Sequence, residues 1–307
     1  MAAQTLGYVP SGCRERLLAH YGPSVQEWLE AAPGLLAEAA KRWDLSLRGY
    51  HDAGHASAVA LAVAPDGSRL VLKAWVDPIR YRHEITALRI WAGGPTAKVA
   101  EAADDLSVAA LELVGGRPGG AHRPARATQS VADAIHRLHA FGRRRPGSGV
   151  PMLTDFMREV VLPRIHQRAQ ALDLGTHDGL VREACHGLAS LSQAPDRTTV
   201  LHADLYAENV IFDARRQPRL IDPHPVEGDA VFDWAFWSVY YDLERGMADR
   251  LATAARISRI PIPEILPWCR ALAVDGLLYY REIRDPAEPK IAAVLSDLLA
   301  TGAGGDR

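Results

Sequence analysis

The hydrophobic positions in the first third of the chain change from helical spacing to the short apolar runs typical of strands. We expect helices over about 24–43 and 78–92 and strands over about 56–64, 69–76, 98–103 and 107–114. Pro33 should break or kink the first helix, and Pro65-Asp66-Gly67-Ser68 has the composition of a hairpin turn. Residues 45–114 therefore predict a small antiparallel sheet with one helix inserted after its third strand.

Beyond a glycine-rich stretch at 115–120 the spacing becomes predominantly helical. We expect helices over about 128–141, 153–174 and 179–193, a β-like island at 200–222, a helix buried on one face at 232–241, and a helical C-terminal third. The glycine-rich stretch is the best boundary between lobes. The pattern thus predicts an α+β protein with an N-terminal lobe at 1–115 and a larger helical lobe at 116–307.

The β-like island carries the most informative motif. It reads His202-x-Asp204-Leu205-x-x-x-Asn209, and an apolar strand ends thirteen residues later at Asp222. Kinases use this arrangement because phosphoryl transfer needs one carboxylate for the hydroxyl proton and two oxygen ligands for Mg²⁺. We predict Asp204 as the base and Asn209 and Asp222 as metal ligands, brought together by a short hairpin. The alternative is that all three are turn and strand-end residues.

A lysine in the first hairpin supports the catalytic interpretation. Lys73 ends an apolar strand, and Glu84 follows eleven residues later in the expected helix. In kinases such a strand lysine contacts the phosphates and pairs with a helix glutamate. Only four of the 35 basic residues are lysines, which makes a lysine in an apolar strand notable. The preceding loop offers Gly54 and Ser57 as phosphate contacts, although it lacks a G-x-G-x-x-G pattern.

Composition narrows the class of protein. The 307 residues carry 35 basic against 37 acidic side chains, a formal charge of −2, and 48% of them are hydrophobic. This balance argues against a nucleic-acid partner, and the absence of a long apolar stretch argues against a membrane protein, so we expect a cytoplasmic globular protein. Cys13, Cys185 and Cys269 suit reduced, partly buried thiols. Oligomeric state is not indicated.

The segment 202–244 is unusually acidic, with nine acids and three bases. Such a segment beside the base would attract a cationic acceptor. The candidates for contacting that acceptor are Glu208, Glu227, Asp229 and Asp242. Asp233, which follows Phe232, is assigned instead to bracing the loop.

Together these residues resemble the aminoglycoside phosphotransferases and, within them, the streptomycin 6-phosphotransferase branch. The resemblance covers nearly the whole chain and is densest at the His202–Asn209 motif and at Ile221-Asp222-Pro223-x-Pro225-Val226-x-Gly228-Asp229-x-x-Phe232-Asp233. It implies a bilobal protein-kinase-like fold, ATP or GTP with Mg²⁺ bound between the lobes, and a small antibiotic whose hydroxyl is phosphorylated and which is thereby inactivated. It also implies a hinge that binds the nucleotide at Glu112, Leu113 and Val114.

Other functions remain as alternatives. The same machinery would serve a metabolic kinase for an amino alcohol or a sugar. A degenerate kinase that binds nucleotide as a regulator is a third possibility, which the intact Asp204, Asn209, Asp222 and Lys73 disfavour. The histidine pairs 51/55 and 136/139 have metal-ligand spacing but no third ligand, so they are interpreted as core or surface residues.

Overall fold

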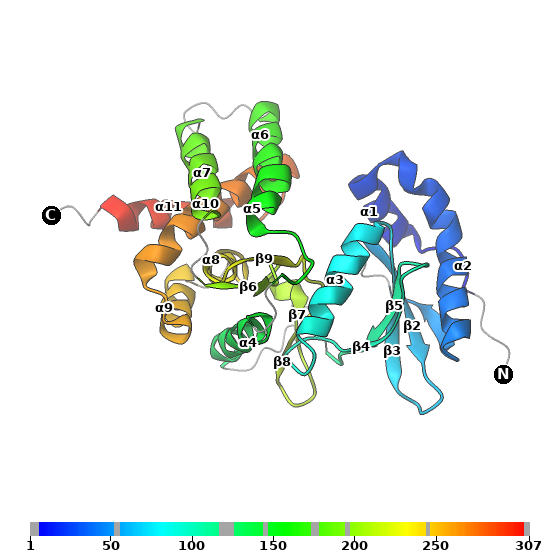
Figure 1. Ribbon diagram of the computed structural model, residues 1–307. Helices are drawn as coiled ribbons and strands as arrows, with labels where there is room; N and C mark the ends of the chain where they lie inside the picture. The colour runs from blue at the N-terminus through cyan, green and yellow to red at the C-terminus, as the bar shows by residue number, and fades with distance from the viewer. Residues whose placement is uncertain are drawn as a thin grey trace. The chain divides into compact units, whose positions relative to one another are not determined.

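The computed structural model describes residues 6–51, 56–116, 126–143, 147–172, 178–193, 197–243 and 246–303. Its chain divides into two compact units, Met1–Gly115 and Gly116–Arg307, and each is described here by itself (Figure 1). No helix among the described residues is long and apolar enough to cross a membrane.

The first unit consists of a five-stranded sheet and its helices. Its elements are α1 (Ser11–Tyr21), the 3₁₀ turn η1 (Pro23–Val25), α2 (Gln26–Arg42), β1 (Ser46–Tyr50), β2 (Ser57–Val63), β3 (Arg69–Trp75), α3 (Pro78–Ile90), β4 (Val99–Ala103) and β5 (Val108–Glu112). The strands are antiparallel in the order β1-β2-β3-β5-β4. The expected sheet with a helix after its third strand is confirmed.

The two faces of this sheet bury different kinds of side chain. Side chains alternate along β3, so Leu70, Leu72 and Ala74 join the apolar core that α2 covers. Lys73 and Trp75 belong to the opposite face, where α3 lies (Figure 1). Helix α3 begins after Asp77, whose side chain accepts a hydrogen bond of 2.8 Å from the Ile79 N–H and so caps the helix.

The helices that precede the sheet, α1 and α2, differ from the expectation in two ways. Helix α2 runs unbroken through Pro33, because its buried face, which includes Leu29 and Leu36, holds it against the sheet. Helix α1 was not predicted, since it buries only Cys13 and Leu17 and its sequence shows little helical periodicity.

The second unit is mainly helical. Its helices are α4 (Ala127–Gly142), α5 (Leu153–Phe156), the π-helical turn η2 (Met157–Val161), α6 (Leu162–Ala171), α7 (Asp178–Leu191), the 3₁₀ turn η4 (Ala207–Asn209), α8 (Val231–Tyr240), α9 (Met247–Ser258), α10 (Ile262–Glu282) and α11 (Glu288–Ala303). Its strands are β6 (Thr198–Leu201), β7 (Val210–Phe212), β8 (Pro218–Leu220) and β9 (Val226–Asp229). The single helix expected at 153–174 is therefore interrupted by a π-helical turn.

The β-like island expected at 200–222 is formed by two short antiparallel pairs of strands. Strands β7 and β8 pair Val210 with Leu220, as the predicted hairpin requires. Strands β6 and β9 pair Thr198 with Asp229 and Leu201 with Val226. Strand β9 was not predicted, because it contains two acids and a glycine. The two ladders place the segments 202–209 and 221–225 beside each other.

Helix α8 is the centre of the second unit. All ten of its residues are buried, whereas a helix buried on one face was expected. Helices α9 and α10 pack against it, and Gly276 of α10 allows this close approach because a Cβ atom there would lie 2.6 Å from the Tyr240 ring. A helix that is buried on every side and mostly apolar, with Asp233 and Ser238 as its polar residues, belongs in the interior of a domain.

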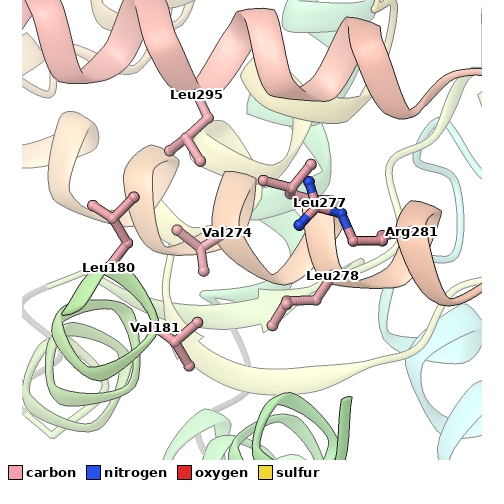
Figure 2. Close-up of a pocket in the computed structure, with 7 residues that line it drawn as sticks. All are labelled: Leu180, Val181, Val274, Leu277, Leu278, Arg281 and Leu295. Atoms are coloured by element: carbon pink, nitrogen blue, oxygen red, sulfur yellow. The ribbon is translucent and has the colours of Figure 1, made fainter. Parts of the chain in front are cut away.

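A small apolar pocket lies between α7, α10 and α11 (Figure 2). It encloses about 260 Å³ of empty space, part of it open to solvent, and is lined by Leu180, Val181, Val274, Leu277, Leu278, Arg281 and Leu295. The three cysteines are free thiols, with Cys13 and Cys269 buried and Cys185 partly buried, as expected.

Candidate active site

The first unit contains the expected lysine–glutamate pair. Lys73 Nζ lies 2.7 Å from Glu84 Oε1, and both side chains are buried. The indole N–H of Trp75 donates a 2.8 Å hydrogen bond to Glu84 Oε2, and Lys73 Nζ lies 4.7 Å from the centre of the same indole ring. The lysine is thus held by a carboxylate that is itself fixed on its second oxygen.

Ser57, Glu112, Leu113 and Val114, also predicted to bind nucleotide, lie near the ends of strands in the same unit. Ser57 begins β2 and is buried, and Gly54 lies outside the described residues. At the end of β5, the N–H of Glu112 donates to the Lys98 carbonyl and that of Leu113 to the Arg69 carbonyl. Val114, which is buried, is the first residue beyond these bonds. Their contact with a nucleotide stays a prediction.

The predicted catalytic loop joins Asp204 and Asn209 directly. The Asn209 side-chain amide donates hydrogen bonds of 2.8 Å to both the backbone oxygen and the Oδ2 atom of Asp204. Since the amide nitrogen faces Asp204, the amide oxygen of Asn209 faces away from it. The turn η4 also fixes Asn209, because the backbone N–H of Asn209 donates a hydrogen bond to the Tyr206 carbonyl.

The β7–β8 hairpin brings Asp222 back toward this loop. The N–H of Ile221 donates a 3.0 Å hydrogen bond to the Asn209 carbonyl, so Asp222 follows the last bond of the hairpin. Its φ of 51° is left-handed, a conformation that aspartate and asparagine tolerate better than most residues. The side chain is exposed, as a ligand for an incoming metal should be.

These residues fit a divalent cation, although no group of three His, Cys, Asp or Glu side chains able to hold one occurs in the described ranges. The fit rests on the Asn209 amide, which has its nitrogen turned toward Asp204, and on the Asp222 carboxylate. An amide oxygen and a carboxylate are hard ligands of the kind that Mg²⁺ prefers, and Mg²⁺ keeps several waters or phosphate oxygens besides.

A buried carboxylate braces the catalytic loop from below. Asp233 accepts hydrogen bonds from the N–H groups of His202 (2.9 Å) and Ala203 (2.8 Å), and its Oδ2 lies 2.9 Å from His139 Nε2. The assignment of Asp233 to bracing is confirmed. Ala203 has a left-handed φ of 56°, which costs an alanine about 1–2 kcal/mol. Asp233 therefore holds a strained residue next to Asp204.

Replacing Asp233 with alanine should lower the free energy of unfolding by about 3–5 kcal/mol, since it leaves buried N–H groups and His139 without their acceptor. Chemical denaturation measures this change. Asp133→Ala is the matched control, because Asp133 is exposed on α4 and should change stability by less than about 0.5 kcal/mol. Equal stability of the two variants would contradict the bracing role.

Two neighbours of Asp204 are held uncharged. Burial lowers the pKa of His202 to about 4, so its imidazole is neutral at physiological pH. Burial first, and then the Asp204 carboxylate, raise the pKa of Tyr206 well above its usual value. The Tyr206 ring packs on Phe236 and Tyr240 at centroid distances of 5.0 and 5.3 Å. Sequence reasoning did not assign Tyr206 a role.

The four predicted acceptor contacts fall into two pairs. Glu227 is buried and accepts hydrogen bonds from the N–H groups of Gly147 and Ser148 and from the Ser148 hydroxyl. Asp229 is buried, pairs with Arg197 at 3.2 Å, and caps α8 by accepting from the Val231 N–H.

Because these oxygens are engaged inside the unit, Glu227 and Asp229 are assigned structural roles in place of the expected acceptor contacts. Glu208 is exposed and lies within electrostatic range of the Tyr280 hydroxyl, and Asp242 is partly exposed. Contact of Glu208 and Asp242 with an acceptor stays a prediction.

Comparisons with known proteins agree with this site. Residues 42–263 match the family model described as aminoglycoside/hydroxyurea antibiotic resistance kinase. Streptomycin 6-kinase of Streptomyces griseus is 29% identical over 74% of this chain and 73% of its own, and that of Streptomyces glaucescens is 30% identical over 76% and 75%. The solved structure of macrolide 2'-phosphotransferase MphH from Brachybacterium faecium aligns with a TM-score of 0.56 at 19% identity, covering 87% of this chain and 98% of that one.

The fold is thus the α+β kinase-like fold of phosphotransferases, as expected. The chain belongs to the aminoglycoside/hydroxyurea antibiotic resistance kinase family. It is a phosphotransferase that uses a nucleotide and acts on a hydroxyl group, and neither a metabolic kinase nor a degenerate regulator is favoured.

Proposed function

We propose that this protein transfers the γ-phosphoryl group of ATP, with Mg²⁺, to a hydroxyl of a cationic, streptomycin-like aminoglycoside and so inactivates the antibiotic. The observation that carries the proposal is the hydrogen bond between Asn209 Nδ2 and Asp204 Oδ2. It couples the predicted base to a predicted metal ligand within one loop, as phosphoryl transfer to an alcohol requires.

The base acts through the carboxylate oxygen that Asn209 does not hold. Asn209 and the braced backbone fix the orientation of Asp204, and we assign its Oδ1 atom to the acceptor hydroxyl. Asp204 takes the hydroxyl proton as the oxygen forms its bond to phosphorus, and the bond from phosphorus to the leaving oxygen of the nucleoside diphosphate breaks.

The predicted nucleotide contacts fall into two sets of residues. The Asn209 amide oxygen and the Asp222 carboxylate would hold Mg²⁺, which when bound neutralises charge on the phosphate oxygens. Lys73, oriented by Glu84, would contact the phosphates as a point charge. Gly54, Ser57, Glu112, Leu113 and Val114 remain candidates for the rest of the nucleotide contacts.

A transfer assay tests the proposal. The purified protein is incubated with Mg²⁺-ATP and, separately, with streptomycin, hydroxyurea, choline, ethanolamine and a neutral hexose, and mass spectrometry detects the phosphorylated product. We expect transfer to streptomycin, and none from the Asp204→Asn variant. Transfer only to choline, ethanolamine or the hexose would identify a metabolic kinase and refute the proposal.

A cationic acceptor should also make binding depend on salt. We expect the KM for streptomycin to rise between low and high ionic strength while kcat changes little, because partly exposed charge pairs are screened over about 8–10 Å near physiological salt. Glu208→Gln and Asp242→Asn should raise this KM at low salt and flatten the dependence. Glu183→Gln on α7, an exposed acid of the same unit, is the control. A flat salt profile in the unaltered protein would show that the acidic segment is ordinary surface.

A further inference from the structure

An aromatic pair in the second unit is attached to the predicted catalytic segments. The rings of Phe156 on α5 and His224 lie 4.9 Å apart between their centroids, with an angle of 43° between their planes. His224 is two residues beyond Asp222, and its N–H donates a 2.9 Å hydrogen bond to the carbonyl of His202. The pair is therefore held by the segment that carries Asp222 and by the one that carries Asp204.

This attachment limits how far the pair lies from the reacting groups. Consecutive Cα atoms are about 3.8 Å apart, so the Cα atom of His224 lies at most about 7.6 Å from that of Asp222. The same limit holds between the Cα atoms of His202 and Asp204. An acceptor made of linked sugar rings is longer than either distance. One hydroxyl of such an acceptor can therefore lie at Asp204 while another part of the molecule contacts the Phe156 ring.

The start of α5 is fixed beside β9. The N–H of Glu227 on β9 donates a 2.8 Å hydrogen bond to the carbonyl of Pro151, just before the helix. Strand β9 then passes so close to α5 that a Cβ atom on Gly228 would lie 2.5 Å from the Leu153 Cβ. In Figure 1, α5 accordingly begins next to β9. Phe156 is one helical turn beyond Leu153, so these contacts fix its backbone before an acceptor binds.

Phe156 belongs to an apolar stripe that solvent reaches. Met152 lies one turn before it and Val160 one turn after it, and these two residues are 38% and 42% exposed. Residues four apart share one face of a helix. Phe156 is itself partly exposed, although His224 packs against its ring. The ring is therefore accessible to a small molecule.

The charge around Phe156 favours a cation. Its polar neighbours on the same helical segment are Asp155, Arg158 and Glu159, and Arg158 pairs with the two acids at 2.7 and 2.8 Å. One positive and two negative side chains leave a net charge of −1. The face of an aromatic ring carries the negative part of its quadrupole and attracts a cation. Ring and charge thus favour the same kind of ligand.

We propose that Phe156 recognises the acceptor by placing the face of its ring against a cationic group, while Asp204 receives the reacting hydroxyl. The proposal rests on the proposed function, since it takes the acceptor to be a cationic aminoglycoside. It supplies an attraction that Glu227 and Asp229 do not, because the oxygens of both carboxylates are bonded inside the unit. Phe156 is then a specificity-determining residue, and His224 positions its ring.

The test compares Phe156→Leu, which removes the ring but keeps an apolar side chain, with Phe156→Trp, which keeps an aromatic face. Phe141→Leu is the matched control, because Phe141 is a partly exposed phenylalanine on α4. The acceptors are streptomycin and an analogue whose guanidinium groups are replaced by neutral, planar urea groups. Kinetics gives KM and kcat for each acceptor and for ATP, and calorimetry gives Kd.

Contact between a cation and an aromatic face contributes about 3–30-fold in affinity. We expect Phe156→Leu to raise the KM and Kd for streptomycin by that factor, while Phe156→Trp and Phe141→Leu stay close to the unaltered protein. Neither the KM for ATP nor the Kd for the urea analogue should change in Phe156→Leu. An unchanged KM for streptomycin, an equal loss for both acceptors, or a rise confined to the KM for ATP would each refute the proposal.

The outcomes also distinguish this proposal from the proposed function. If the unaltered protein binds streptomycin without phosphorylating it, the proposed function fails, and Phe156 is judged from Kd alone. If the protein phosphorylates choline or ethanolamine instead, the same variants are compared with that cation, and a Kd that Phe156→Leu leaves unchanged refutes the role of the ring. If the protein binds no cationic compound, both proposals are wrong.

Discussion

Replacing Asp204 with alanine lowers kcat by about 10²–10⁴-fold, the usual contribution of a general base, while the affinity for ATP stays near that of the unaltered protein. We expect kcat to fall without a loss of ATP affinity because the predicted metal ligands keep their backbone hydrogen bonds. Asn209 retains its bond to the backbone oxygen of residue 204, and the Ile221 bond to Asn209 does not involve that side chain. Rapid-quench measurement of one turnover, beside ATP binding by calorimetry, gives both quantities.

Two further variants test whether the loss of kcat comes from the Asp204 carboxylate. Asp204→Asn keeps the shape and removes the basic oxygen, so it should resemble Asp204→Ala in kcat. Asp297→Asn changes an exposed aspartate on α11 in the same way and should leave kcat unaltered. A kcat for Asp204→Ala within a few-fold of the unaltered value would show that another group receives the proton.

Asp222→Asn should have the other large effect, a loss of at least about 10³-fold in kcat together with weaker, Mg²⁺-independent ATP binding. Removing the carboxylate takes away one of two protein ligands, and metal-assisted stabilisation of phosphoryl transfer amounts to several kcal/mol. Asparagine is the informative replacement because residue 222 has a left-handed φ of 51°, which asparagine adopts at a lower cost than alanine does. Titration of ATP binding against Mg²⁺ measures the change.

Asp222→Ala should lose the metal in the same way and also be less stable by about 1–2 kcal/mol, the cost of that φ for a residue without a polar side chain. The comparison therefore separates ligand loss from backbone strain. Normal Mg²⁺ dependence and activity in Asp222→Asn would remove the metal site and, with it, the mechanism proposed above.

Most of the first unit was predictable because contacts between elements adjacent in the sequence determine its structure. Pro65-Asp66-Gly67-Ser68 sets the β2–β3 hairpin, whose pairing of Val63 with Arg69 follows from the turn. The eleven-residue step from Lys73 to Glu84 spans one strand end and two helical turns, so the ion pair follows from neighbouring elements. Helix α1 lacks such a signal, since it is held by two buried residues and by contacts that only the folded unit supplies.

In the second unit, helices α4 and α7 and the catalytic loop were predictable. The spacing from Asp204 to Asn209 and the hairpin to Asp222 are again local, and the hydrogen bonds join them as the motif implies. The burial of Glu227 and Asp229 is not local, because it depends on the pairing of β9 with β6. Acids in a short strand look like surface residues until the partners of that strand are known.

The contact between α6 and α10 at Arg164 and Asp275 could not be read from the sequence. Arg164 and Asp275 are 111 residues apart, and neither belongs to a motif. Their contact is set by how α6 packs on α10, and the π-helical turn that precedes α6 has no recognised residue pattern. Long-range packing of ordinary helices, rather than a residue motif, thus determines this contact.

The hydrogen bond from Trp75 to Glu84 places a fluorescent side chain against the Lys73–Glu84 ion pair. An indole that is buried, bonded to a carboxylate at 2.8 Å and overlain by an ammonium at 4.7 Å has its emission set by those two charges. Any displacement of Lys73 toward a phosphate changes the electric field across that ring. Because the chain has seven tryptophans, a variant that keeps Trp75 and replaces the others would report occupancy of the proposed phosphate contact by its intrinsic fluorescence, with no label to attach.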